Sequence, residues 1–65
     1  MEITVNGKIM QTDAKTIETL MQNLGIKEKV MATALNMEVV KKEVWSSTFL
    51  KNGDKIEFLE FVGGG

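Results

Sequence analysis

The segment TIETLMQNLG, residues 16–25, constrains the fold more than any other part of the chain. Its large apolar side chains stand at positions 17, 20, 21 and 24, the spacing of one helix face. Thr16 precedes the first of them as a candidate N-cap, with Asp13 as its rival. Gly25 is placed to end the helix in a left-handed conformation. A helix with one apolar face has to pack that face against another element.

Strand patterns surround this helix. Residues 1–5 alternate apolar and polar side chains, the period of a half-buried strand. Asn6-Gly7 follows, a strong hairpin signal, and residues 8–11 are then expected to return antiparallel. A two-residue turn would place Ile3 with Met10 on one side of the hairpin, and Thr4 with Ile9 on the other.

The second half of the chain adds further strands and turns. The patterns predict, in order, a strand at 30–35, a turn at 36–38, a short strand at Val39-Val40, a loop or single helical turn within 41–50, a turn at 51–54 and a last strand at 55–62. A hairpin, then a helix, then strands indicates an α+β fold, with the helix across one face of a mixed sheet.

Length and composition exclude several classes of protein. A chain of 65 residues forms one domain, which buries only about 60% of its unfolded surface. Eight basic and nine acidic residues give a net charge of −1, so no nucleic-acid partner is expected. Cysteine is absent, which argues against a small secreted, disulfide-stapled protein. No apolar run spans a bilayer and no signal peptide is evident, so no membrane partner and a cytoplasmic location are expected.

Side chains that could carry chemistry are few. Histidine is absent along with cysteine. Glu57 and Glu60 lie three apart on a strand and therefore point to opposite faces, so they are interpreted as solvated surface. Lys41-Lys42 is interpreted as an exposed turn. The five methionines suggest core filling more than an adaptable binding surface, and Trp45 suggests a plug for the core more than an interface anchor. No catalytic side chain and no metal site are predicted.

The last strand is apolar on both sides. Ile56 and Phe58 take one side, and Leu59 and Phe61 take the other. One helix covers one face, so the second apolar side predicts either an exposed partner site or a two-sided central strand.

The chain then ends in Gly63-Gly64-Gly65. Glycine loses more conformational freedom on ordering than any other residue, so this end is expected to be flexible. It could be a cloning scar or a frayed end of no consequence. Alternatively, a tail without side chains can thread a narrow channel and present its carboxylate at the far end. Such a carboxylate is a substrate that needs activation, typically as an acyl adenylate.

Three segments together carry a resemblance to a known family. TIETLMQNLG, ATALNMEVVKKEVW and LKNGDKIEFLEFVGGG are similar to the helix, the Asn-centred turn with its valine pair and tryptophan, and the C-terminal signature of the ThiS family. These are sulfur carriers of thiamin biosynthesis with a ubiquitin-like β-grasp fold. The resemblance covers essentially the whole chain. It implies a β-grasp domain at 1–62 and a flexible tail at 63–65. Met37 stands where the family usually has glycine.

The resemblance also implies a reaction cycle. A ubiquitin-activating-type, ThiF-like adenylyltransferase uses ATP to activate the carboxyl group of Gly65, and a sulfur donor protein then supplies sulfur to give a thiocarboxylate. A ThiG-like thiazole synthase accepts that sulfur. Gly63 and Gly64 are the implied threading arm, and Leu59, Phe61 and Val62 the implied partner-binding residues. The carrier is expected to bind no cofactor, to be no enzyme itself and to be a monomer when free.

Three alternatives stay open. The small subunit of molybdopterin synthase shares the fold and a di-glycine end, and so do ubiquitin-like modifiers. A plain interaction domain with a cloning scar is the third.

Overall fold

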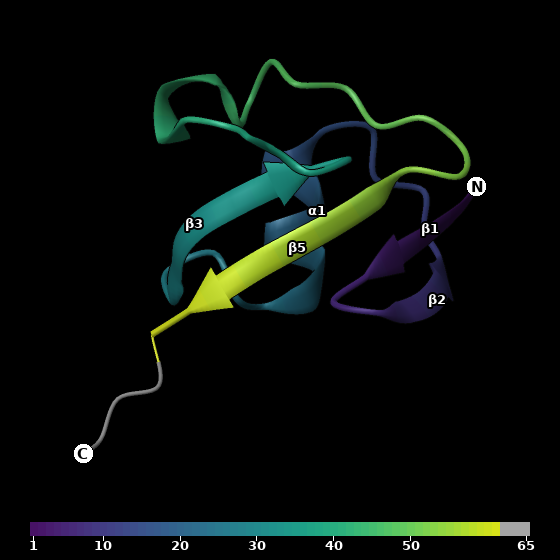
Figure 1. Cartoon of the computed structure of the whole chain (residues 1–65), viewed down its shortest axis with the longest axis horizontal. Helices are drawn as coiled ribbons and strands as arrows, with labels where there is room; N and C mark the ends of the chain where they lie inside the picture. Colours follow the sequence, from purple (N-terminus) through teal and green to yellow (C-terminus); the bar gives the residue numbers. More distant parts are fainter. Residues whose placement is uncertain (62–65) are drawn as a thin grey trace.

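The computed structural model describes residues 1–61, which form five strands, one α-helix and a short 3-10 helix (Figure 1). In chain order these are β1 (Glu2–Val5), β2 (Lys8–Gln11), α1 (Ile17–Leu24), β3 (Val30–Leu35), β4 (Glu38–Val39), the 3-10 helix (Lys42–Val44) and β5 (Lys55–Glu60). Their order is the order predicted from the sequence.

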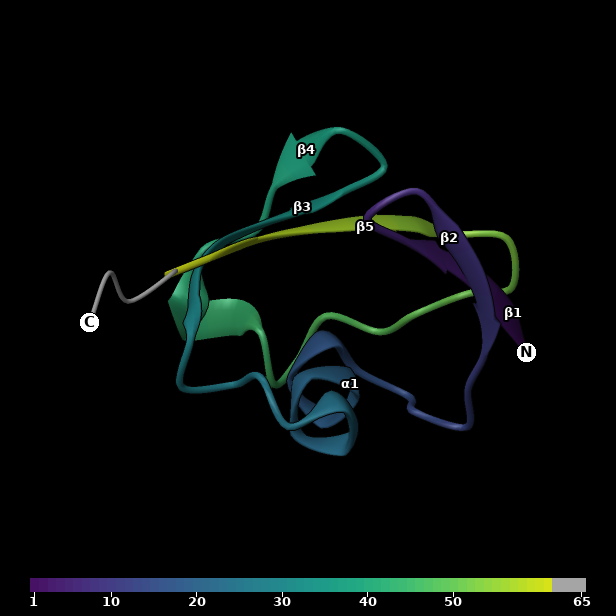
Figure 2. The ribbon, with the colours of Figure 1, turned by 90° about the horizontal axis from the view of Figure 1, so that it is seen from below.

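The strands form one mixed sheet in the order β2-β1-β5-β3-β4. The first and last strands, β1 and β5, pair in parallel at its centre, and the other neighbours are antiparallel. Figure 2 shows α1 lying against one face of this sheet. A mixed sheet with one helix across one face is the arrangement of a β-grasp domain, so the predicted fold class is confirmed for residues 1–61.

Helix α1 begins and ends where its capping residues dictate. The Thr16 hydroxyl accepts a hydrogen bond from the Thr19 N–H at 3.2 Å, so the N-cap is Thr16 and not its rival Asp13. Gly25 has a φ of 70° and donates its N–H to the Gln22 carbonyl, the left-handed C-cap that the sequence predicted. At eight residues α1 is too short to cross a membrane, and no other helix within residues 1–61 is long enough.

The first hairpin has the predicted two-residue turn. Asn6 and Gly7 have φ values of 48° and 84°, as a tight turn of the type favoured in hairpins requires. The resulting register pairs Ile3 with Met10 and Thr4 with Ile9, which confirms the predicted sides.

The core lies between α1 and the sheet. Its buried apolar residues are Ile3, Val5, Ala14, Ile17, Leu20, Met21, Trp45, Leu50, Ile56 and Phe58. Trp45 closes this core and donates its indole N–H to the Val40 carbonyl at 2.9 Å, so it is a core plug and not an interface anchor. Core filling is confirmed for Met21, and Met10 is partly buried against the core. Met31 and Met37, which the sequence left ambiguous, are exposed.

Three strands have other bounds than the predicted ones, and the first of them begins at Glu2 and not at residue 1. Asn36 and Met37 complete the turn with two positive φ values, so the short strand starts at Glu38 and ends at Val39. The last strand ends at Glu60, and Phe61 lies beyond it. Val62 and the glycine tail at 63–65 lie outside the described residues.

Candidate functional site

Strand β5 presents its alternate side chains to two different environments. Ile56 and Phe58 point toward α1, and Phe58 is only 6% exposed. Leu59 points away from the helix and is 61% exposed. Within residues 1–61 no helix lies on that side of the sheet (Figure 2), so the exposed-site interpretation is favoured over a strand buried on both faces.

Neighbouring strands extend the apolar surface around Leu59. The register places Ala32 opposite Leu59, and Ala34 opposite both Glu57 and Val39. Side chains of directly opposed residues share a face of the sheet. We refer to Ala32, Ala34, Val39 and Leu59 as the apolar patch. It borders a shallow groove of about 470 Å³, which is also lined by Asn6, Thr33, Glu57 and Phe58.

Phe61 continues the exposed apolar surface beyond β5. Its side chain is 62% exposed, and its N–H donates to the Lys29 carbonyl at 2.6 Å. That hydrogen bond anchors the last described residue beside the start of β3. Of the three partner-binding residues predicted from the resemblance, the structure thus describes Leu59 and Phe61 as exposed apolar side chains. Val62 and Gly63, Gly64 and Gly65 fall outside the described part.

The two carboxylates of β5 do not converge. Glu57 lies on the open face beside the apolar patch, whereas Glu60 lies three residues further along the strand, on the opposite face. Lys41 and Lys42 are exposed at the start of the 3-10 helix. Within residues 1–61 no three metal-ligating side chains come together.

Three polar residues that the sequence suggested only as turn formers hold β5 in place. The Asn6 side chain accepts a hydrogen bond from the Phe58 N–H at 2.7 Å and donates to the Phe58 carbonyl at 3.3 Å. Asn36 donates to the buried Asp54 carboxylate at 3.0 Å and accepts from the Lys55 N–H at 2.9 Å. These contacts join turns to β5 across 18 to 52 residues, and no local pattern predicts such a reach.

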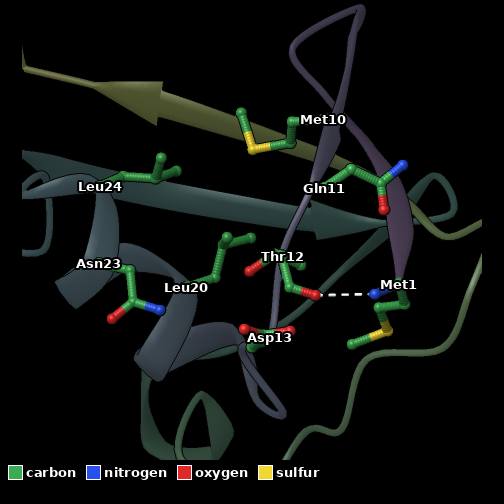
Figure 3. Close-up of a pocket in the computed structure, with 8 residues that line it drawn as sticks. All are labelled: Met1, Met10, Gln11, Thr12, Asp13, Leu20, Asn23 and Leu24. Atoms are coloured by element: carbon green, nitrogen blue, oxygen red, sulfur yellow. Dashed lines mark hydrogen bonds between the residues drawn. The ribbon is translucent and has the colours of Figure 1, made fainter.

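A second hollow lies between the first hairpin and α1 (Figure 3). It encloses about 360 Å³ and is lined by Met1, Met10, Gln11, Thr12, Asp13, Leu20, Asn23 and Leu24. The terminal amine donates to the Thr12 carbonyl at its margin, at 2.9 Å. No residue of β5 or of the apolar patch lines this hollow, so it is separate from the surface that leads toward the C-terminus.

Comparison with known proteins gives a consistent result. The model of the ThiS family matches residues 2–65. The chain is 30% identical to the sulfur carrier protein ThiS of Escherichia coli, over the full length of both. The crystal structure of the thiamine biosynthesis protein ThiS from Geobacter metallireducens superposes with a TM-score of 0.82, at 38% identity and full coverage of both chains.

A longer protein shares the same region. The chain is 33% identical to part of a thiazole synthase from Paramagnetospirillum magneticum. The match covers the whole of this chain but spans only 20% of that enzyme's length. In that organism a region similar to this chain is therefore joined to a thiazole synthase.

Proposed function

The chain belongs to the ThiS family, and from that membership we propose that it is a sulfur carrier of thiamin biosynthesis. The single observation that carries the proposal is the family match, which includes the C-terminal glycines. In this proposal the carboxyl group of Gly65 receives the sulfur, and Gly63 and Gly64 form the arm that delivers it.

The chemistry needs enzymes other than the carrier. A free carboxylate is a poor electrophile, so an adenylating enzyme joins it to AMP from ATP and releases pyrophosphate. Sulfur at the oxidation level of sulfide then attacks the carbonyl carbon and displaces AMP, which breaks the carbon–oxygen bond to the phosphate and leaves a thiocarboxylate. A donor protein that holds its sulfur as a persulfide first gives an acyl disulfide, and a thiol reductant supplies the two electrons that cleave its S–S bond. The carrier contributes the reacting carboxyl group and its presentation, and in this proposal it is a substrate and not a catalyst.

Thiazole synthase is the proposed acceptor of the sulfur. The support is the similarity between this chain and a fifth of a thiazole synthase, because joining two proteins in one chain keeps them at a high effective concentration. This observation favours a thiazole pathway over a molybdopterin or protein-modifier role.

The apolar patch, together with Phe61 and Val62, is the proposed docking surface. Ordering a tail costs about 1–2 kcal/mol per residue in backbone entropy, and more for glycine. Contacts made by the tail alone are therefore a weak source of affinity. Exposed apolar side chains next to the start of the tail can supply the rest of the binding free energy, since burying one of them contributes roughly 1.5–3 kcal/mol.

The test is to change the end of the chain without touching the fold. One variant lacks Gly65, a second carries one extra residue after it, and a control carries Ile9→Ala on the exposed part of β2. Each is incubated with the adenylating enzyme, ATP and the sulfur donor, and its mass is measured. The parent and the control are expected to exchange one oxygen for one sulfur atom, and both end variants are expected to stay unmodified. Normal modification of the extended chain would contradict the assignment to Gly65.

A further inference from the structure

The backbone groups of β5 alternate between its two neighbours. On one side the Ile56 carbonyl accepts from the Asn6 N–H at 2.9 Å, and both backbone groups of Phe58 bond to the Asn6 side chain. On the other side the Phe61 N–H donates to Lys29, at the start of β3. Because N–H and C=O groups of successive strand residues point in opposite directions, those of Glu60 face the side of the first hairpin.

The hairpin does not reach Glu60. The pairing of β1 with β5 ends at Val5 opposite Ile56, and the Asn6 side chain extends the contact only as far as Phe58. Within residues 1–61 no hydrogen bond joins Glu60 to the hairpin. Figure 1 shows the C-terminal part of β5 running past the hairpin, with only β3 beside it. Among the residues that the structure describes, one edge of this central strand is therefore free at Glu60.

We infer that an extended segment of thiazole synthase pairs with this free edge and adds a strand to the sheet at Glu60. The inference rests on the proposed function and specifies how the partner recognises the carrier. An exposed sheet edge is a template for strand addition, in which backbone hydrogen bonds supply affinity. This edge directly precedes residues 62–65, which must enter the partner's active site. A segment paired here would fix the direction in which the tail leaves the body.

Two features select a partner enzyme over a second copy of this chain. The edge is continuous with the proposed docking surface, because Leu59 and Phe61 flank Glu60 in sequence and both side chains are exposed. Two copies paired antiparallel about Glu60 would also place two Glu60 carboxylates opposite each other, and like charges directly opposed on a sheet are destabilising.

The test removes the Glu60 N–H and leaves the rest of the edge. Glu60→Pro lacks the donor at a position where proline is tolerated, since the N–H points away from the paired neighbour. Glu60→Ala is the matched control that keeps the N–H. Gln11→Pro is a second control on the outer edge of β2, where the neighbouring Thr12 N–H faces Met1 and the Gln11 N–H faces outward.

Dissociation constants for purified thiazole synthase and thermal midpoints are measured for each variant. Loss of one backbone hydrogen bond weakens binding roughly threefold to tenfold. Glu60→Pro is expected to show this loss relative to Glu60→Ala, while Gln11→Pro binds like the parent. In the parent complex the Glu60 amide is expected to exchange more slowly with solvent than in the free carrier.

Several outcomes would overturn the inference. Equal binding by Glu60→Pro and Glu60→Ala would show that the edge is not used. A dimer of the parent that Glu60→Pro dissociates would show that the occupant is a second copy. If the proline variant fails to fold, an ester in place of the Leu59–Glu60 amide, introduced by chemical synthesis, removes the same N–H and is judged by the same comparison. Failure of the parent itself to bind thiazole synthase would instead refute the proposed partner.

Discussion

At the scale of single residues, Met37 adopts a backbone conformation that favours glycine. Its φ is 72°, in the turn between β3 and β4, and its side chain is 84% exposed. A left-handed conformation costs a residue with a Cβ about 1–2 kcal/mol, and the exposed side chain recovers little of this by packing. The sequence placed methionine where the family usually has glycine, and the structure shows that the turn keeps the glycine-type geometry.

Met37→Gly is therefore expected to stabilise the protein. The gain should be about 1 kcal/mol or less, because relief of the left-handed strain exceeds the greater freedom of glycine in the unfolded chain. Met37→Ala keeps a Cβ and should change stability by less than about 0.5 kcal/mol. Urea denaturation would measure the unfolding free energy of both variants, with the slope of that free energy against urea concentration unchanged from the parent. Equal stability of the two variants would mean that the turn stores no strain at this position.

Thr33 is a second residue whose side chain does not match its surroundings. It is buried on the core side of β3, and its hydroxyl has no hydrogen-bond partner among residues 1–61. A buried polar group without a partner costs roughly 1–3 kcal/mol. Valine has the same shape, so Thr33→Val is expected to raise the free energy of unfolding by about 1 kcal/mol or more.

The N-cap threonine provides the matched comparison. Thr16→Val makes the same chemical change but removes the hydroxyl that accepts from the Thr19 N–H, so it is expected to cost about 1 kcal/mol. The unfolding free energy is expected to rise in Thr33→Val and to fall in Thr16→Val. Changes of opposite sign would confirm that the hydrogen bond of the hydroxyl decides the effect. A loss of stability in Thr33→Val would contradict this account.

At the scale of elements, alternate side chains of β5 have different roles: those on one face stabilise the core, and those on the other face form the proposed docking surface. Phe58 belongs to the core, whereas its neighbour Leu59 belongs to the apolar patch. Phe58→Ala is expected to cost about 3–5 kcal/mol of stability. Leu59→Ala should leave the denaturation midpoint nearly unchanged and weaken binding to the adenylating enzyme by roughly tenfold to a hundredfold.

The decisive measurement for β5 pairs a denaturation midpoint with a dissociation constant for each of these two variants. If Leu59→Ala lost several kcal/mol of stability and bound normally when folded, Leu59 would be a core residue. The docking surface would then lie elsewhere on the molecule.

The elements differ in how well the sequence predicts them, and the reason is the range of the interactions involved. Helix α1 and the first hairpin were predicted because their caps and turn residues act within a few positions. The sides of β5 were also predicted, because alternation is local. The bonds from Asn6 to Phe58 and from Asn36 to Asp54 were not predicted, because a turn pattern does not indicate which distant strand the side chain will meet.

The candidate functional site shows the same difference between features set by local sequence and features set by distant contacts. The two-sided apolar strand and the single helix predicted exposure of Leu59 and Phe61 as one of two alternatives, the other being a strand buried on both faces. The additional members of the apolar patch, Ala32, Ala34 and Val39, required the register of three strands. The free edge at Glu60 required the length of the hairpin relative to β5, which is a property of the assembled sheet.

At the scale of the whole molecule, the first and last strands meet at the centre of the sheet. The start of β1 is also tied to the turn before β5, since the Glu2 N–H donates to the Asn52 side chain at 2.8 Å and the Glu2 carbonyl accepts from Gly53 at 2.7 Å. Among residues 1–61, the buried core runs from Ile3 to Phe58. Residues 1–61 thus contain an apolar core of their own, and we expect the glycines at 63–65 to serve the reaction and not the fold.

If the body folds and the tail reacts, a substitution in the tail is expected to change the rate of thiocarboxylate formation and not the stability of the fold. Gly64→Val widens the proposed threading arm and restricts its backbone, because valine is branched at Cβ. The denaturation midpoint is expected to match that of the parent, since no core residue is altered. Thiocarboxylate formation should slow by roughly a hundredfold, the order of loss expected when a reacting group is displaced by about an ångström. The dissociation constant should change much less, because the apolar patch still docks.

Gly64→Ala provides the graded control, with a side chain but no branching, and should fall between the parent and Gly64→Val in rate. Single-turnover rates, measured by mass with enzyme in excess, separate the chemical step from binding. Parent-like rates for Gly64→Val would mean that the tail passes through no narrow channel. A reduced midpoint would mean that the tail packs on the body, and the division between a folded domain and a delivery arm would then be wrong.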